Sequence, residues 1–189
     1  MTTGRVRVKR SGALRCLTGL ALAAAVLAGA ACTGGGAPSG GSSSAVPASL
    51  PRSPAALPTF DLARFRDLLT QLRGRPVVVD VWASWCGPCI EQAPHIADVA
   101  RRFGDRVQFV GVDSQDQLGP ARAFIRRYGW TFPSVFDPRA EIMRGLGFLA
   151  QPITQIYLPD GRQDRRGFWA SVFDEHELVS ELDRVLSSG

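Results

Sequence analysis

Residues 77–89 read Val-Val-Val-Asp-Val-Trp-Ala-Ser-Trp-Cys-Gly-Pro-Cys, and the fold can be inferred from this stretch outward. The β-branched run over 76–82 is typical of a buried central strand. Cys86 and Cys89 follow it, at the predicted start of a helix. Two cysteines separated by two residues at a strand-to-helix junction indicate a reversible dithiol/disulfide centre.

Other uses of this cysteine spacing fit less well. Half of a zinc site would need two further ligands, and after the N-terminal segment the chain offers only His95 and His176 besides these cysteines. A structural disulfide across so short a loop would constrain the unfolded chain very little. The sequence therefore favours redox chemistry and predicts no metal site.

Helical and strand-like segments alternate on both sides of this stretch. The residue patterns predict helices at 61–73, 86–103, 118–128, 137–144 and 174–186, and strands at 76–82, 107–112, 131–136, 153–158 and 162–169. Strands joined by helical crossovers are parallel, whereas Pro159-Asp160-Gly161 predicts an antiparallel hairpin between the last two. We expect an α/β fold with a mixed central sheet and helices on both faces.

The N-terminal segment has the composition of an export signal. Residues 1–15 hold five basic residues and no acid, and an apolar Leu/Ala run follows to residue 31. Five of the 22 basic residues lie there, which leaves 17 against 17 acidic residues in the rest of the chain. The overall pI of about 9.6 therefore gives no reason to expect nucleic acid as a partner.

Three regions are expected along the chain: a signal peptide at 1–31, a flexible tether at 32–58 and a folded domain at 59–189. Cys32 directly follows small residues at the end of the signal, which resembles the lipobox of bacterial lipoproteins and implies a lipid-bearing cysteine. The alternatives are ordinary cleavage, which would release a secreted protein, and an uncleaved anchor. The Gly, Ser, Ala and Pro residues after Cys32 cannot bury enough apolar surface to fold.

The predicted element order, residues 77–89 and Pro152 together resemble the thioredoxin superfamily over about residues 60–187. Phe-Val-Gly-Val-Asp at 109–113 and Phe-Pro-Ser-Val-Phe-Asp-Pro at 132–138 are similar to the TlpA/ResA-like branch, which includes the DsbE/CcmG-like proteins. This resemblance implies a thioredoxin-like fold with an insertion between core strands 2 and 3. It also implies an extracytoplasmic thiol-disulfide oxidoreductase.

The two cysteines are assigned different roles. At a helix N-terminus, Cys86 faces free backbone N–H groups and the positive end of the helix dipole, which favour its thiolate. We expect Cys86 to attack the substrate and the more buried Cys89 to resolve the mixed disulfide. Gly87 and Pro88 lie between them, contact substrate and tune the thiolate. The same pair occurs in thioredoxin, whose potential is about −270 mV, which favours a reducing role.

Asp80 lies in the middle of the central strand, where an ionised carboxylate is costly to bury. Its pKa should therefore be raised. The resemblance implies that Asp80 exchanges a proton with Cys89. The alternative is an aspartate that reaches solvent at the edge of the strand.

The remaining site assignments concern substrate contact and pH coupling. The resemblance implies a cis peptide bond at Pro152 and places the backbone of Gln151 against the dithiol and the substrate. Trp85 is expected to be an apolar contact surface beside Cys86. Asp116 is the candidate for an acid that couples redox state to pH, and a solvated loop acid is its alternative reading.

The expected function is an enzyme without a cofactor, anchored outside the cytoplasm by lipid. The resemblance implies protein thiols and disulfides as substrates, including apocytochrome c, a CcdA/DsbD-like membrane thiol carrier as electron donor, and a monomeric protein. An oxidative, disulfide-forming role and a copper-binding module are the alternatives. A peroxidase signature would need proline at Val79 and threonine or serine at Ala83, and neither is present.

Overall fold

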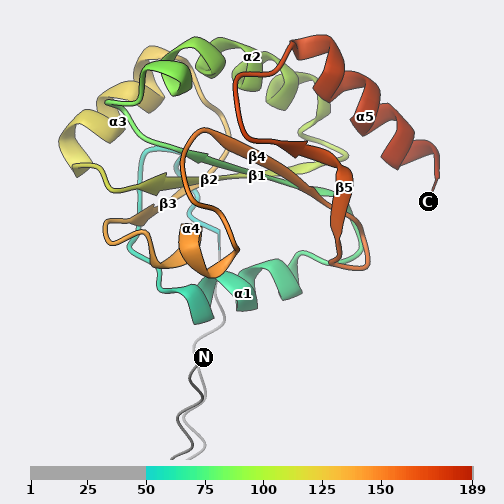
Figure 1. The fold of residues 1–189 in the computed structure, drawn as a ribbon, viewed down its shortest axis with the longest axis horizontal. Helices are drawn as coiled ribbons and strands as arrows, with labels where there is room; N and C mark the ends of the chain where they lie inside the picture. Colours follow the sequence, from blue (N-terminus) through green and yellow to red (C-terminus); the bar gives the residue numbers. More distant parts are fainter. Residues whose placement is uncertain (1–49, 189) are drawn as a thin grey trace, which may run out of the picture. The chain divides into compact units, whose positions relative to one another are not determined.

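The computed structural model describes residues 50–188 of the 189-residue chain. The helices are α1 (Leu62–Gln71), α2 (Gly87–Phe103), α3 (Leu118–Arg127), α4 (Glu141–Gly145) and α5 (Glu175–Ser187). The strands are β1 (Val77–Trp82), β2 (Gln108–Ser114), β3 (Ser134–Asp137), β4 (Ile153–Tyr157) and β5 (Gln163–Trp169) (Figure 1). The predicted signal peptide, Cys32 and most of the predicted tether lie outside these residues. None of the helices within 50–188 has the length and apolar character needed to cross a bilayer.

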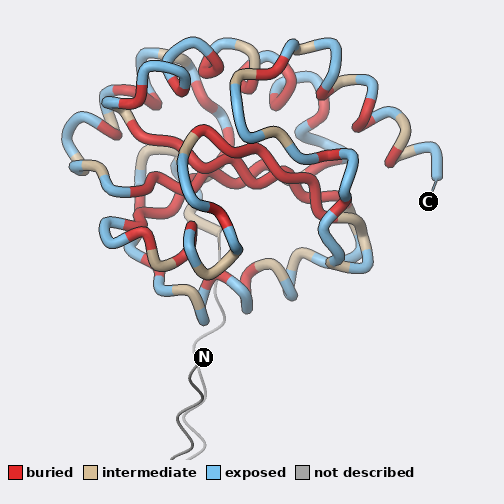
Figure 2. The backbone as a smooth tube through the Cα atoms, in the orientation of Figure 1, coloured by how far each residue is buried: buried red, intermediate tan, exposed pale blue. Residues whose placement is uncertain are grey.

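The five strands form one mixed sheet in the order β3-β2-β1-β4-β5. β1 pairs in parallel with β2, and β2 pairs in parallel with β3. β4 and β5 form the antiparallel part, with β4 paired to β1. The predicted α/β class, the parallel crossovers and the antiparallel hairpin are confirmed. β1 lies in the centre of the sheet, which is why all six of its residues are buried (Figure 2).

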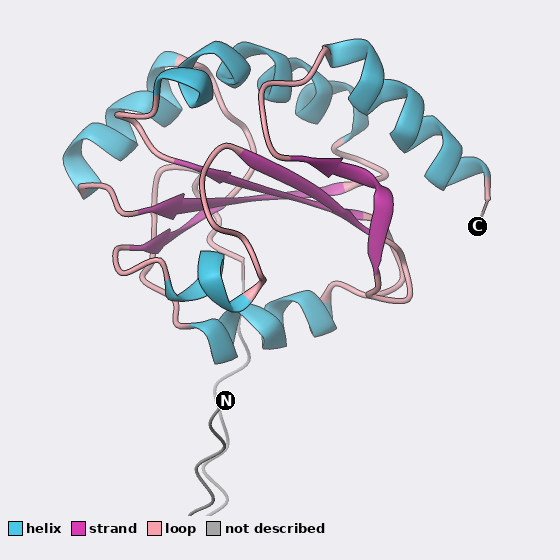
Figure 3. Ribbon diagram, in the orientation of Figure 1, coloured by secondary structure: helices cyan, strands magenta, loops and turns pink. Residues whose placement is uncertain are grey.

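Helices cover both faces of the sheet (Figure 3). Residues Val78 and Trp82 of β1 belong to the apolar cluster that packs under α2, α3 and α5. Val79 and Val81 belong to the cluster on the opposite face, under α1 and α4. Because successive side chains of a strand point to opposite faces, Asp80 projects to the α2 side.

Local signals set the ends of the helices much as predicted. The Asp61 carboxylate accepts a hydrogen bond from the Arg64 N–H at 2.8 Å and caps α1. Asp174 caps α5 in the same way through the His176 N–H. Gly74, with φ of +102°, follows α1 in a conformation that favours glycine.

The short helix near residue 140 differs from its prediction. It was expected from Asp137 onward, but α4 begins only at Glu141. The Asp137 carboxylate instead accepts hydrogen bonds from the N–H groups of Glu141 and Met143, at 2.8 and 3.0 Å. Asp137 therefore ends β3 and caps the helix from four residues upstream.

The folded domain also begins earlier than residue 59, where the tether was expected to end. Leu57 is only 2% exposed and belongs to the core cluster under α2. The Arg122 guanidinium donates to the carbonyls of Ala55 and Ala56, and Pro58 accepts from the Phe136 N–H at 2.9 Å. Apolar burial and backbone pairing therefore hold the last residues of the predicted tether on the domain.

Candidate active site

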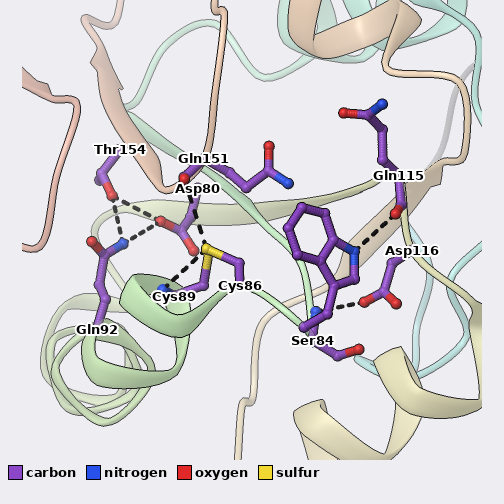
Figure 4. The surroundings of a disulfide bond; sticks show 10 residues. Asp80, Ser84, Cys86, Cys89, Gln92, Gln115, Asp116, Gln151 and Thr154 are labelled. Atoms are coloured by element: carbon purple, nitrogen blue, oxygen red, sulfur yellow. Dashed lines mark hydrogen bonds between the residues drawn. A yellow bond between two sulfur atoms is a disulfide. The ribbon is translucent and has the colours of Figure 1, made fainter.

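The two cysteines lie at the N-terminus of α2 and form a disulfide, as the sequence predicts for a redox pair. Cys86 is the N-cap residue, and its Sγ accepts a hydrogen bond from the Cys89 N–H at 3.3 Å (Figure 4). Gly87 and Pro88 form the first turn of the helix between them. The same N–H that contacts the disulfide sulfur can stabilise a Cys86 thiolate in the reduced protein.

Exposure does not distinguish the two cysteines in this oxidised state. Cys86 is 5% exposed and Cys89 is 3% exposed, so the expected greater burial of Cys89 amounts to very little. Their positions differ more than their exposure does, because Cys86 caps the helix while Cys89 lies within its first turn. The distinction between attacking and resolving thiol therefore depends on the helix terminus.

The Gln151–Pro152 peptide bond is cis, as the resemblance implies. The carbonyl oxygen of Gln151 lies 3.7 Å from the Cys86 Sγ. This loop precedes β4, whose first residues pair with β1. The central sheet thus brings the loop to the end of α2 that carries the cysteines.

Asp80 is buried in β1, with an exposure of 2%. Its burial raises the pKa of the carboxyl from 3.8 to about 7, against the lowering effect of hydrogen bonds from Thr154 and Gln92. The predicted rise of the pKa is confirmed, and the alternative of a solvent-exposed strand-edge aspartate is wrong. A group with a pKa near 7 can take up and release a proton at neutral pH.

Two polar partners of Asp80 were not anticipated from the sequence. The Gln92 Nε2 and the Thr154 hydroxyl both donate to Asp80 Oδ1 at 2.8 Å, and Gln92 also donates to the Thr154 hydroxyl at 3.0 Å. Gln92 follows Cys89 by three residues, on the buried face of α2. The spacing of three residues from Cys89 is the signal that could have identified Gln92. Thr154, on β4, has no such signal in the sequence.

Both hydrogen bonds to Asp80 go to the same oxygen. An oxygen that already accepts two donors is poorly suited to carry a proton, so the neutral acid carries its proton on Oδ2. Figure 4 shows the Asp80 carboxyl on the disulfide side of the Gln92 amide. Gln92 and Thr154 can therefore set the orientation of the ionisable group.

Trp85 and Asp116 are connected to the segment that enters the active site. Trp85 is 60% exposed, and its indole N–H donates to the Gln115 carbonyl at 2.9 Å. Asp116 Oδ2 accepts from the Ser84 N–H, and its Oδ1 accepts from the Gln117 N–H at 2.7 Å. Asp116 is therefore bound to the active-site segment rather than free in solvent (Figure 4).

Exposed apolar side chains lie next to the two cysteines in the chain and in the loop that precedes Pro152. Trp85 and Ile90 each adjoin a cysteine, and Ile90 is 40% exposed. Leu149, two residues before Gln151, is 89% exposed and was not singled out from the sequence. Ser84 and Ile90 also line an open depression of about 280 Å³ against α3. These surfaces are suited to contact with another polypeptide.

Trp82 differs from Trp85. Its side chain is 1% exposed and stacks on Phe124 with ring centroids 4.7 Å apart. Trp130 meets it edge-on at 4.9 Å. Trp82 is thus part of the core beneath the site. Within residues 50–188, no group of three or more His, Cys, Asp and Glu side chains is arranged to hold a metal ion.

Curated relatives of this chain include two thiol-disulfide proteins. The thiol-disulfide oxidoreductase ResA of Bacillus subtilis (strain 168) is 27% identical over 95 residues, which cover 50% of this chain and 53% of ResA. The thiol:disulfide interchange protein DsbE homolog of Paracoccus denitrificans is 30% identical over 114 residues, which cover 59% of this chain and 62% of that protein. The chain thus spans about half the length of the curated relatives it matches.

Solved structures share the fold. The structure of MTB dsbF in its mixed oxidized and reduced forms matches with a TM-score of 0.56 and 28% identity, covering 61% of this chain and 84% of that one. A secreted Mycobacterium tuberculosis disulfide oxidoreductase homologous to E. coli DsbE matches with a TM-score of 0.56 and 25% identity, over 61% and 85% of the two chains. The profile of the AhpC/TSA family matches residues 56–165. Since that match covers more than half of the chain, the protein belongs to the AhpC/TSA family and has a thioredoxin-like fold.

Proposed function

We propose that this protein is a thiol-disulfide oxidoreductase that exchanges the Cys86–Cys89 pair with cysteines of other proteins. The observation that carries the proposal is the disulfide at the N-terminus of α2, next to a buried carboxyl with a pKa of about 7. The names of the relatives from Bacillus subtilis and Paracoccus denitrificans support the same chemistry.

In the reducing direction, the Cys86 thiolate attacks a substrate disulfide and releases one substrate thiolate, which takes up a proton. A mixed disulfide between Cys86 and the substrate results. Cys89 then loses its proton to ionised Asp80 and attacks the Cys86 sulfur, which releases the second substrate sulfur as a thiolate that takes up a proton from water. Two electrons have passed to the substrate, and the Cys86–Cys89 disulfide has formed.

Substrate contact is assigned to the surface around Cys86. Trp85, Gly87 and Pro88 adjoin Cys86 in the chain or lie in the first turn of α2, and the carbonyl oxygen of Gln151 before Pro152 lies 3.7 Å from its sulfur. The backbone of Gln151, whose carbonyl lies beside the Cys86 sulfur, would pair with an extended substrate segment. Leu149 adds an exposed apolar side chain to the same loop.

The proposal extends to the location of the protein, its substrate and its electron donor. Residues 1–31 would direct export, Cys32 would carry a lipid anchor, and the chain up to about residue 50 would tether the domain outside the cytoplasm. Apocytochrome c is the proposed substrate, and a CcdA/DsbD-like membrane thiol carrier would return the electrons. This setting is supported by the composition of residues 1–49 and by the similarity to ResA, to the DsbE homolog and to a secreted disulfide oxidoreductase.

The same chemistry run in reverse would form disulfides in exported proteins. A redox titration against glutathione separates the two directions: the Gly-Pro dipeptide predicts a potential below that of protein disulfide isomerase, about −180 mV. A higher value would favour the oxidative role. Peroxide reduction remains unsupported, because Val79 and Ala83 replace the residues of the peroxidase signature.

Trapping tests the assignment of the thiols. A Cys89→Ser variant cannot resolve the mixed disulfide, so Cys86 should remain bonded to partner proteins that appear as higher-mass bands on non-reducing gels and disappear with dithiothreitol. Cys86→Ser is the matched control and should trap nothing. Equal trapping by the two variants, or none by either, would contradict the proposed exchange.

A further inference from the structure

A cavity of about 420 Å³ lies at the opposite end of the sheet from the disulfide. Residues of α1, of the end of α4 and of the hairpin formed by β4 and β5 line it (Figure 1). Tyr157, one of these residues, pairs with Val77 at the start of β1, whereas the cysteines follow the other end of that strand. The thiol exchange described above therefore makes no use of this cavity.

The lining of the cavity is positively charged. Among the residues that the structure describes, it includes Arg66 and Arg73 and no acidic side chain; the other lining residues are Leu, Thr, Gly, Tyr and Gln. The charge of Arg73 also acts on the exposed Asp160, but that carboxylate already pairs with Arg162 at 2.6 Å. Two cations thus face one cavity without an acid in its walls, which favours a negatively charged ligand.

Contacts with two other elements hold the arginine side chains at the cavity. The Arg66 guanidinium donates to the carbonyl of Gly145, at the end of α4, at 2.9 Å, which leaves further N–H groups of this guanidinium for a ligand. A Cβ atom at Gly161 would lie 2.7 Å from Arg73 Nε. The Arg73 side chain therefore packs directly on the turn between β4 and β5, where glycine leaves the space for it.

Tyr157 contributes a buried hydroxyl group to the same cavity. The residue is 6% exposed, and its oxygen accepts a hydrogen bond from Gln163 Nε2 at 3.2 Å. Burial raises the pKa of the phenol, so it keeps its proton at neutral pH. Within residues 50–188, no group accepts a hydrogen bond from this O–H. Because buried tyrosine hydroxyls usually have a partner, an acceptor in the cavity would complete the site.

We propose that this cavity binds the phosphate group of a small phosphate monoester. Such a group carries a charge of about −1.5 to −2 at pH 7, which balances Arg66 and Arg73, whereas a carboxylate balances only one of them. Guanidinium groups match phosphate oxygens in paired hydrogen bonds, and the Tyr157 hydroxyl donates to a further oxygen. Leu69 and Leu146 also line the cavity, so the short carbon body of the ester contacts them.

The test titrates the oxidised, ¹⁵N-labelled full chain with glycerol 3-phosphate and follows the backbone N–H resonances of Thr70 and Gly161, which line the cavity. The shifts should saturate with a Kd of about 1 mM or lower, and sodium chloride at the same ionic strength should not reproduce them. Arg66→Gln and Arg73→Gln should each weaken binding about fivefold or more. Tyr157→Phe keeps the ring and should weaken binding about threefold.

Arg126→Gln is the matched control, because it removes the same charge from an exposed position on α3, which covers the other face of the sheet (Figure 3). Its affinity should equal that of the wild type. Arg66 and Arg73 are themselves exposed, so their substitution should preserve the fold and the rate of insulin reduction.

A second probe identifies the source of the phosphate group. Dihexanoyl phosphatidic acid, used below its micelle-forming concentration, presents the same group on a lipid. Tighter binding of this lipid than of glycerol 3-phosphate would assign the site to a membrane headgroup, and weaker or equal binding would assign it to a soluble monoester. If neither probe gave saturable shifts, or if both arginine variants kept the wild-type affinity, the proposal would be overturned and the thiol exchange would be unaffected.

Discussion

Asp80 is subject to two opposing effects within one side chain. Burial in the central strand disfavours its charge, while hydrogen bonds from Thr154 and Gln92 favour it. Burial dominates and brings the pKa to about 7. A carboxyl with this pKa is useful for passing a proton, but its ionisation opposes folding at neutral pH, because the unfolded chain ionises near pH 3.8.

Asp80→Asn should therefore stabilise the oxidised protein in a pH-dependent way. The folded pKa is raised, so the wild type loses free energy of unfolding as pH rises from about 4 to about 7, and the loss stays constant above that. We expect the variant to be more stable by about 4 kcal/mol at pH 8 and nearly unchanged at pH 3. Urea denaturation at the two pH values measures this. An equal change in the free energy of unfolding at the two pH values would show that ionisation of Asp80 is not the cause.

The same variant should lose activity where proton transfer limits exchange. Asparagine cannot accept the Cys89 proton, so insulin reduction should slow about tenfold or more at pH 7. The rate should then lose its dependence on a group with a pKa near 7. An unchanged pH profile would remove Asp80 from the proton relay.

At the scale of elements, α5 is joined to the hairpin strand β5 by a small ionic network. The Arg184 guanidinium contacts Glu181 on its own helix and Asp164 on β5. Arg166 of β5 lies 3.5 Å from Glu181. Asp164 and Glu181 are more than nine-tenths buried. Arg184 is the cation that contacts both of them and compensates their charge.

Arg184→Met should cost about 2 kcal/mol of unfolding free energy, because it leaves two buried acids short of a cation. Arg101→Met is the matched control: Arg101 pairs with Asp98 on the exposed surface of α2, where an ion pair contributes less than about 0.5 kcal/mol. Both are measured by urea denaturation at pH 7. Similar costs for the two variants would contradict a structural role for the network.

At the scale of the molecule, the domain includes residues whose composition suggests a linker. Leu57 is buried in the core cluster that α2, α3 and α5 cover, although its neighbours are Ala, Pro and Ser. Leu57→Ala should therefore cost about 3 kcal/mol, the usual range for a buried leucine. Leu149→Ala, at an 89% exposed position, should change stability by less than about 0.5 kcal/mol. If Leu57→Ala left the free energy of unfolding unchanged, residues 50–58 would belong to the tether and not to the folded domain.

Much of the fold follows from short stretches of sequence. Val77–Trp82 is continuously apolar except for Asp80, and a strand of that kind is stable only in the middle of a sheet. Cys86 before Gly87 and Pro88 specifies a helix N-terminus because proline is favoured in the first turn. The composition of residues 50–58 predicts a tether, and this prediction was wrong. The composition of a segment indicates its average burial, but it does not show that a single leucine, Leu57, packs into the core.

The sequence by itself determined the dithiol, its place at a helix N-terminus and the raised pKa of a carboxyl within a buried strand. Each depends on residues a few positions apart, whose geometry local backbone preferences decide. Only the tertiary structure decided what surrounds them: Thr154 lies 74 residues from Asp80, the Gln151 carbonyl 65 residues from Cys86, and Asp116 32 residues from Ser84. Such contacts depend on strand register and on the packing of α2 against the sheet, which no local pattern encodes.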